Sequence, residues 1–269
     1  MPELPEVETV VRTLEHQIHN QKIENVIVRY PKMIDCSPAT FKKKLVGQHF
    51  RRFDRRGKYL LFYLDDILLV VHLRMEGKFF IQKKEEPINK HIHVVFQLNG
   101  KNELRYQDTR KFGRMELLPL NTDLKTFHEL GPEPFEEEFN ASYIKNFLKG
   151  KSCPVKSLLL DQSFVAGIGN IYADEILFAC RIRPGRSVKR LTYKDCENIV
   201  FYTRDILNKA IQAGGTTIRS YTSSLGVTGR FQLSCQVHAQ KFCGTCGTEN
   251  HVKWIGGRSS YYCPKCQEK

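Results

Sequence analysis

The first eighteen residues carry apolar side chains at a helical spacing. Proline at position 5 suits the first turn of a helix, where its missing N–H costs nothing. The apolar residues that recur at intervals of three and four are Val7, Val10, Val11, Leu14 and Ile18. The stretch MPELPEVETV is therefore predicted to begin a helix with one buried face.

From about Lys22 to Pro119 the pattern becomes that of β-strands. Residues that are β-branched or aromatic dominate KIENVIVRY, KYLLFYLDDILLVVHLRMEGKFFI and HIHVVFQLNGKNELRYQD. The pairs Asp65–Asp66 and Asn99–Gly100 stand where hairpin turns are needed. We expect an antiparallel β-sandwich or barrel behind the leading helix.

Pro132 and Pro134 interrupt the chain in HELGPEPF, and helical periodicity follows in ASYIKNFLKG, PVKSLLLDQ, NIYADEILFACRI and YKDCENIVFYTRDILNKAIQAG. A polar, glycine-bearing loop comes next, in GGTTIRSYTSSLGVTGRFQ. We predict an α+β multidomain chain. Its parts are a β-sandwich domain at 1–133, a helical domain at 134–235 that includes a loop at 214–229, and a C-terminal hairpin at 236–269.

The charge of the chain favours a polyanionic partner. Its 42 Lys and Arg against 29 Asp and Glu leave a net charge of +13, which suits nucleic acid or an anionic membrane surface. No uncharged stretch has the length of a membrane span, and the first residues lack the basic and apolar regions of a signal peptide. We therefore expect a cytoplasmic protein that does not act at a membrane.

Four of the nine cysteines form two C-x-x-C pairs in CGTCGTENHVKWIGGRSSYYCPKC. The paired residues are Cys243, Cys246, Cys263 and Cys266. Four thiolates at this spacing match a tetrahedral Zn(II) site on a β-hairpin. Since sulfur fills every position, no place is open for water and the metal is expected to be structural. His251 is then a loop residue rather than a ligand.

Three other stretches have the chemistry of phosphate binding. Arg258 lies at the hairpin tip in GGRSS, where a solvated arginine is the alternative. Gly167 and Gly169 precede a helix that opens at Asn170, and helix N-termini attract anions, although a simple N-cap is the alternative. The run RRFDRRGK, ending at Lys58, crowds positive charge at the entry to a strand and favours contact with a nucleic-acid backbone.

Pro2 gives the N-terminus a second interpretation. Removal of Met1 leaves Pro2 with a free secondary amine. An α-amino group has a pKa of about 7.7–8.0, against about 10.4 for lysine, so far more of it is neutral and nucleophilic near pH 7. With an aldehyde, a secondary amine forms a cationic iminium, which is an electron sink. From the first ten residues alone, a helix start remains the alternative.

In order along the chain, these motifs resemble the bacterial formamidopyrimidine-DNA glycosylase family, which removes 8-oxoguanine and ring-opened purines and then nicks the abasic strand. The likeness runs through PELPEVET, RRGKYL, HLRMEGKF, DTRKFGRM, LLDQSFVAGIGNIYADEIL and the four-cysteine hairpin. It implies a β-sandwich domain, a helix-two-turn-helix domain and a zinc finger, with double-stranded DNA in the cleft. It also implies one structural Zn(II), no catalytic metal or organic cofactor, and a monomer in the bacterial cytoplasm.

The resemblance assigns catalytic roles to Pro2, Glu3, Glu6 and Lys58. Pro2 is expected to attack C1′ of the damaged nucleotide, Glu3 to protonate the deoxyribose ring oxygen, and Glu6 to assist. The iminium acidifies the C2′ protons, so that β-elimination and δ-elimination cut the strand. Lys58 is grouped with these residues and is also expected to grip phosphate.

The same resemblance implies contacts with DNA. The residues expected to hold backbone phosphates are His72, Lys156, Asn170 and Arg258. For His72 the alternative is a hydrogen-bonded sheet histidine. The residues expected to fill the gap left by the everted base are Met75, Arg110 and Phe112, with Arg110 facing the orphaned cytosine.

The expected pocket for the flipped base consists of Glu76 and the loop residues Thr217, Ile218, Arg219, Ser220, Tyr221, Thr222, Ser223 and Ser224. One stretch departs from the family pattern. Before its first zinc cysteine the family usually carries V-Y-G-(R/K), whereas this chain has CQVHAQKFC, with His238, Ala239 and Gln240 in place of Tyr, Gly and the basic residue. The departure bears on how the zinc hairpin docks and on DNA affinity.

Two other functions fit parts of the sequence. A sister enzyme resembling endonuclease VIII would excise oxidised pyrimidines, but Met75, Arg110 and Phe112 favour the branch directed at purines. A catalytically silent DNA-binding protein would keep the zinc hairpin and the phosphate grips. Such a protein has no need of a free proline amine beside Glu3.

Overall fold

The computed structural model describes residues 1–216 and 229–268, which belong to two compact units. The first unit is Met1–Asp123 with Gly214–Gly229, and the second is Leu124–Ala213 with Arg230–Lys269. The three-part division predicted from the sequence, with boundaries at 133/134 and 235/236, stays a prediction.

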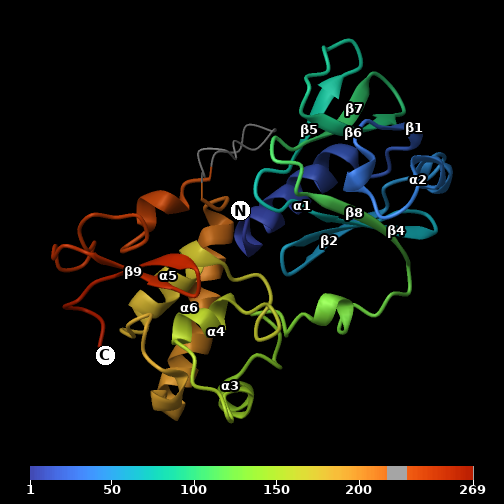
Figure 1. Ribbon diagram of the computed structural model, residues 1–269. Coiled ribbons are helices and arrows are strands. Elements are labelled where there is room, and N and C mark those ends of the chain that lie inside the picture. Colours follow the sequence, from blue (N-terminus) through green and yellow to red (C-terminus); the bar gives the residue numbers. More distant parts are fainter. Residues whose placement is uncertain (217–228, 269) are drawn as a thin grey trace. The chain divides into compact units, whose positions relative to one another are not determined.

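The described part of the first unit contains helix α1 (Leu4–Ile18) and two four-stranded antiparallel sheets (Figure 1). One sheet has the order β1-β6-β7-β5, with β1 at Ile23–Val28, β5 at Lys78–Lys83, β6 at Ile92–Leu98 and β7 at Asn102–Gln107. The other has the order β2-β3-β4-β8, with β2 at Arg52–Arg56, β3 at Tyr59–Tyr63, β4 at Ile67–His72 and β8 at Arg114–Pro119. The predicted antiparallel sheets with a leading helix are confirmed.

Helix α1 buries the predicted apolar face in a core shared with the strands. The side chains of Val7 and Leu14 are fully buried in this core beside Phe62 and Phe96. The helix begins at Leu4, so Pro5 takes its second position rather than the first. Burial of such a stripe is what holds a helix of this length in place.

Helix α2 (Pro38–Leu45) was not predicted from the sequence. Three consecutive lysines occupy its last turn, and only Phe41 and Leu45 are buried, so its apolar pattern is too short to stand out. The side chain of Ser37 accepts the N–H of Thr40 and caps the helix.

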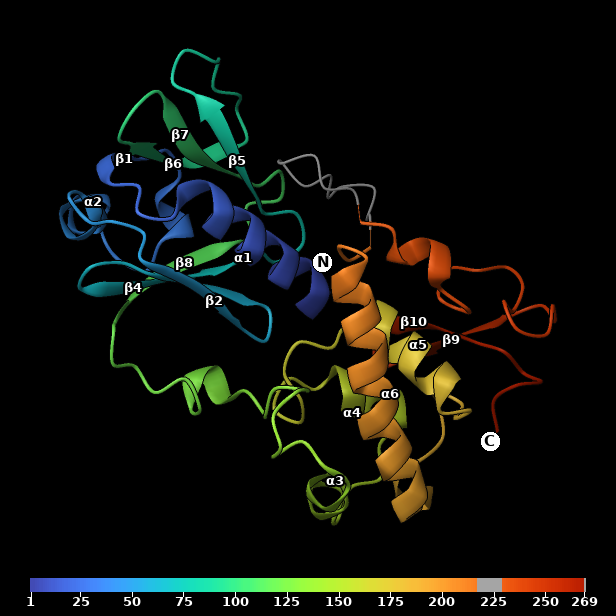
Figure 2. The same ribbon diagram turned by 180° about the vertical axis from the view of Figure 1, so that it is seen from behind.

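The described part of the second unit contains four α-helices and one β-hairpin (Figure 2). They are α3 (Ala141–Phe147), α4 (Val155–Leu160), α5 (Asn170–Ala179), α6 (Tyr193–Gln212), β9 (His251–Ile255) and β10 (Arg258–Tyr262). Helix α5 packs against α4, α6 and strand β10. The four helical segments predicted from the sequence and the two-stranded hairpin are confirmed.

Short 3-10 helices complete the description, at Pro31–Met33, Phe127–Glu129, Val188–Arg190 and Phe231–Ser234. Within residues 1–216 and 229–268, no helix combines the length and the apolar character needed to cross a membrane.

Candidate active site and metal centre

The carboxylate of Glu6 organises the N-terminus. Glu3 is the N-cap of α1 and forms a capping box with Glu6, whose Oε2 accepts the Glu3 N–H at 2.9 Å. The other oxygen, Oε1, accepts the N–H of Thr216 at 2.8 Å and its hydroxyl at 3.1 Å. Glu3, Glu6 and the preceding Pro2 are all buried. Glu6 therefore fixes the residue next to Pro2 and links it to the residue that precedes segment 217–228.

Lys58 and His72 are both buried in the β2-β3-β4-β8 sheet. Lys58 lies in the two-residue turn between β2 and β3, and His72 ends β4. The His72 Nδ1 accepts the N–H of Arg74 at 2.9 Å, so a neutral ring carries its proton on Nε2. The ring packs edge-on against Tyr59, with centroids 4.6 Å apart. His72 thus has the surroundings of a sheet histidine and keeps Nε2–H as its donor.

The basic run forms strand β2 and, as predicted, leads directly into the next strand, β3. Two of its arginines are engaged within the unit. The Nε atom of Arg51 lies 2.6 Å from Asp65 Oδ1, and the Nε atom of Arg55 lies 3.0 Å from Glu8 Oε2. These ion pairs reduce the positive charge that the run presents to a partner.

Two turns meet at the phenol of Tyr106. A Cβ atom on Gly77 would lie 2.1 Å from the Tyr106 Oη, and a Cβ atom on Gly113 would lie 1.7 Å from it, so only glycine fits at either position. The Thr109 hydroxyl joins the turns again by donating to Glu76 Oε2 at 3.0 Å. The predicted site residues on these turns are Met75 and Glu76 in one, and Arg110 and Phe112 in the other.

The buried carboxylate of Asp108 shapes the second turn. Its Oδ1 accepts the N–H of Arg110 at 2.9 Å, and its Oδ2 accepts those of Phe112 and Gly113 at 2.9 and 2.8 Å. Lys111, between them, has a positive φ of 58°. The turn presents Phe112, which is 46% exposed, with the Arg110 guanidinium 4.8 Å from its ring centroid. The backbone therefore sets where these two side chains project.

Asn170 is the first residue of α5 and follows the N-cap Gly169, so it is not the N-cap itself. The Gln162 side chain braces the preceding turn, donating to the Ile168 carbonyl at 2.9 Å and accepting the Gly167 N–H at 3.0 Å. Among the described residues, the buried Asn170 Oδ1 has no hydrogen-bond partner. Oδ1 is an acceptor, so a phosphate would take its hydrogen bonds from the Asn170 NH2 group and from the N–H groups of this helix N-terminus instead.

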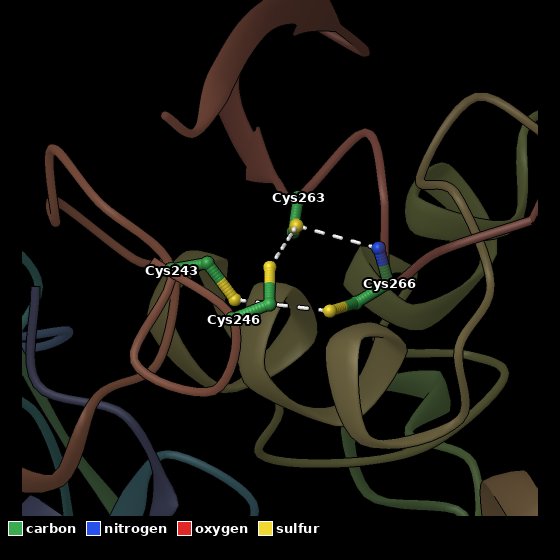
Figure 3. A group of neighbouring side chains, drawn as sticks. All are labelled: Cys243, Cys246, Cys263 and Cys266. Atoms are coloured by element: carbon green, nitrogen blue, oxygen red, sulfur yellow. Dashed lines mark hydrogen bonds between the residues drawn. The ribbon is translucent and has the colours of Figure 1, made fainter. Parts of the chain in front are cut away.

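The four predicted cysteine ligands come together in the second unit (Figure 3). The Sγ atoms of Cys246 and Cys263 lie 3.5 Å apart, and those of Cys243 and Cys266 lie 3.9 Å apart. A tetrahedron of sulfurs about 2.3 Å from a zinc ion has edges of about 3.8 Å. The four sulfurs are therefore placed to hold one metal ion.

Ionisation of these thiols is coupled to the binding of a cation. A hydrogen bond with the Thr248 side chain lowers the pKa of Cys246 to about 6, whereas burial raises the pKa of Cys266 to about 12. The thiols do not all ionise together at neutral pH. A divalent cation supplies the positive charge that favours four thiolates, and it releases protons when it binds.

Arg258 is exposed at the start of β10. It follows the turn Gly256–Gly257, which packs against α4: a Cβ on Gly256 would lie 2.9 Å from the Ser157 Oγ. The hairpin therefore presents this arginine to solvent from a position fixed against a helix.

Lys156 is engaged inside the second unit. Its side chain is 0% exposed, its Nζ lies 2.6 Å from Asp174 Oδ1, and Nζ donates to the Ser259 carbonyl at 2.9 Å. A buried, paired ammonium has no free surface for a phosphate, which argues against the predicted DNA contact. The predicted pocket residues Thr217 to Ser224 lie outside the described residues.

The buried carboxylates that support these positions were not predicted from the sequence. Asp108 opens DTRKFG, and an Asp ahead of a glycine-bearing turn is typical of a side chain that binds main-chain N–H groups. Asp174 and Glu175 lie inside the apolar helix NIYADEILFA. Burial raises the pKa of Glu175, and the N–H groups of Gln236, His238 and Val237 oppose that effect. Acidic residues within an otherwise apolar helix are the feature of the sequence that indicates such buried carboxylates.

Replacing Asp108 by alanine should destabilise the first unit. Each hydrogen bond to a charged group contributes about 1.5–3 kcal/mol. In the variant the loosened turn lets water bind some of the freed N–H groups. We therefore expect the free energy of unfolding to fall by the equivalent of one or two of these hydrogen bonds. Urea denaturation measures it. The exposed Asp54→Ala variant is the control, and an Asp108→Ala variant as stable as that control would contradict the role of the carboxylate.

Comparison with known proteins identifies the family. Models of the formamidopyrimidine-DNA glycosylase N-terminal domain and H2TH domain match residues 1–115 and 130–222. The formamidopyrimidine-DNA glycosylase of Bacillus licheniformis is 44% identical over 275 residues, covering 100% of both chains. That of Oceanobacillus iheyensis is 41% identical, covering 99% of this chain and 98% of its own.

Solved structures agree with these matches. A Lactococcus lactis FPG mutant in complex with a Fapy-dG containing DNA matches with a TM-score of 0.94 at 39% identity, covering 100% of each chain. The Lactococcus lactis Fpg with an abasic site containing DNA matches with a TM-score of 0.94, also at 39% identity, covering 99% of this chain and 100% of that one. The chain belongs to the formamidopyrimidine-DNA glycosylase family.

Proposed function

We propose that this protein excises oxidised purines, 8-oxoguanine and formamidopyrimidines, from double-stranded DNA and then cleaves the abasic strand. The observation that carries the proposal is the buried N-terminal group of Pro2, Glu3 and Glu6, in which one carboxylate holds the residue next to the nucleophile. Nucleophilic catalysis needs an amine held in position as much as a reactive one.

The proposed reaction uses these residues in sequence. The Pro2 nitrogen bonds to C1′ as the bond from C1′ to the damaged base breaks, and the N–H proton of Pro2 passes to the departing base. Glu3 gives a proton to the deoxyribose ring oxygen, so the sugar opens and the electrons of nitrogen form a cationic iminium with C1′. The iminium acidifies C2′, and loss of a C2′ proton expels the 3′ phosphate, after which δ-elimination expels the 5′ phosphate. Water then hydrolyses the iminium, which releases the sugar remnant and frees the Pro2 amine, and the DNA strand is left with a one-nucleoside gap.

Preference for purines rests on the two turns that meet at Tyr106. Arg110 and Phe112 project from a turn shaped by Asp108, and Met75 lies on the turn locked against it. Such a set can fill the space of an everted base and offer a guanidinium to the orphaned cytosine. The solved relatives were bound to Fapy-dG or abasic DNA, which is consistent with this substrate class.

DNA affinity is proposed to come from Lys58, His72, Asn170 and Arg258 through phosphate contacts. Arg258 is exposed, and Asn170 offers an NH2 donor in the first turn of a helix, so both suit this role. We propose zinc as the ion held by the four cysteines, because a closed set of four thiolates is typical of structural zinc. Its task is to order the hairpin that carries Arg258.

Borohydride trapping tests whether the Pro2 amine forms the covalent intermediate with DNA. On a duplex with 8-oxoguanine opposite cytosine, the wild-type protein should form a covalent complex whose peptide map places the DNA on Pro2, because borohydride reduces an iminium to a stable amine. A form verified by mass spectrometry to keep Met1 should give no complex, since acylation removes the lone pair. Full trapping of that form would overturn Pro2 and point to Lys58.

A matched duplex that carries an oxidised pyrimidine separates the two enzyme branches. Trapping there in preference to 8-oxoguanine would favour the function that resembles endonuclease VIII. A catalytically silent DNA-binding protein would be trapped on neither duplex.

Replacing Cys266 by serine should remove the metal and abolish DNA binding while the first unit stays folded. The cluster around the cysteines has a small core, with Val237 packed against Cys243 and Cys263, so the hairpin depends on the ion for order. Elemental analysis should find one zinc per wild-type chain and one in the Cys36→Ser control. Metal-free Cys266→Ser protein that binds DNA normally would contradict the assignment.

A further inference from the structure

His238 lies in the stretch that departs from the family pattern, and it binds a buried aspartate on α5. Its Nδ1 lies 2.7 Å from Asp174 Oδ2. The Asp174 side chain is 0% exposed and that of His238 is 16% exposed. A carboxylate only accepts, so the imidazole must carry a proton on Nδ1. His238 is therefore a donor to a carboxylate that water does not reach.

The same carboxylate reaches strand β10, which packs beside α5 (Figure 2). The Tyr261 N–H donates to Asp174 Oδ2 at 3.3 Å, a long bond, and Lys156 Nζ lies 2.6 Å from Oδ1. Lys156 in turn donates to the Ser259 carbonyl at 2.9 Å. His238 thus makes the short hydrogen bond to Oδ2, while Lys156 occupies Oδ1.

The main chain around His238 is held independently of its side chain. Glu175 accepts the N–H groups of Gln236, Val237 and His238 at 2.8, 3.0 and 2.8 Å. Ala239 has a φ of 56°, a conformation that costs a residue with a Cβ about 1–2 kcal/mol. The backbone of residues 236–239 keeps this conformation without a glycine, and in this conformation the His238 ring points toward Asp174.

The network links two of the proposed phosphate contacts. Asn170 precedes Asp174 by four residues on α5, so the two lie on the same face about one turn apart. Ser259, which Lys156 binds, is next to Arg258. The Asp174 carboxylate is thus connected through Lys156 to the residue next to Arg258.

We propose that His238 is a positioning residue for DNA binding: through Asp174 it holds β10 so that Arg258 and Asn170 contact phosphates of the same DNA. The proposal rests on the proposed function, because Arg258 has this task only when DNA is bound. Without His238, the buried Oδ2 is left with the long Tyr261 bond and turns toward its other partners. Strand β10 and Arg258 then move with it.

The test compares His238→Ala, His238→Asn and His238→Gln. Asparagine places an N–H donor the same number of bonds from Cα as Nδ1, whereas glutamine places its donor one atom further out. Each protein is assayed for zinc and for binding to a duplex with 8-oxoguanine opposite cytosine over a series of salt concentrations. The slope of log K against log [salt] falls by about 0.9 for each lost phosphate contact with duplex DNA.

We expect His238→Ala to keep its zinc and lose about 0.9 from the slope. His238→Asn should restore the wild-type slope, and His238→Gln should resemble alanine. Arg258→Ala should give the same loss, and the double variant His238→Ala/Arg258→Ala should lose no more than either single variant. A histidine that served only to stabilise the fold would lower the melting temperature without this shared loss.

An unchanged slope for His238→Ala, a slope that asparagine does not restore, or additive losses in the double variant would overturn the proposal. If His238→Ala loses zinc, the asparagine variant decides: with zinc bound, a wild-type slope supports the role and a reduced slope overturns it. An unchanged slope for Arg258→Ala would show that Arg258 does not bind phosphate, which overturns that part of the proposed function and the role of His238 with it. A reduced slope for Arg258→Ala together with an unchanged slope for His238→Ala would overturn only the role of His238.

Discussion

Buried carboxylates that accept main-chain N–H groups hold the irregular segments of this protein that carry the proposed site residues. Glu6 accepts from Glu3 and Thr216, and Asp108 accepts from three residues of the turn that carries Arg110. Glu175 accepts from three residues ahead of the cysteine cluster. In each case the N–H groups of a short irregular segment donate to one buried carboxylate, where in a helix or sheet they would donate to main-chain carbonyls.

These hydrogen bonds fix the position of the segment more than they stabilise the folded protein. Burying a carboxylate costs free energy, and charge-assisted hydrogen bonds return most of that cost only when their geometry is good. The segment is then confined to the path that satisfies the anion. For catalysis and DNA binding such confinement matters, because a nucleophile or a guanidinium must already lie where it is needed. The side chains that project from these segments are then placed before DNA arrives.

The sequence predicted those elements that depend only on the spacing of residues close together in the chain. The apolar face of α1, the strand segments and the two C-x-x-C pairs all follow from spacing within a few residues. The tertiary partners did not follow from the sequence. Lys156 carries no local sign that it binds Ser259, which is 103 residues away, and the DNA contact predicted for it rests on the family resemblance alone. Helix α2 escaped prediction because only two of its residues are buried.

The most direct measurement is single-turnover excision of 8-oxoguanine by Glu6→Gln. Glutamine keeps the shape but replaces one acceptor by an NH2 group, so the N–H of either Glu3 or Thr216 then faces a donor. A lost hydrogen bond to a charged group is worth about 1.5–3 kcal/mol, and we expect the rate to fall at least about tenfold with zinc retained. Glu15→Gln, on the same helix, should react like the wild type. A wild-type rate for Glu6→Gln would contradict the claim that this carboxylate positions the proposed nucleophile, Pro2.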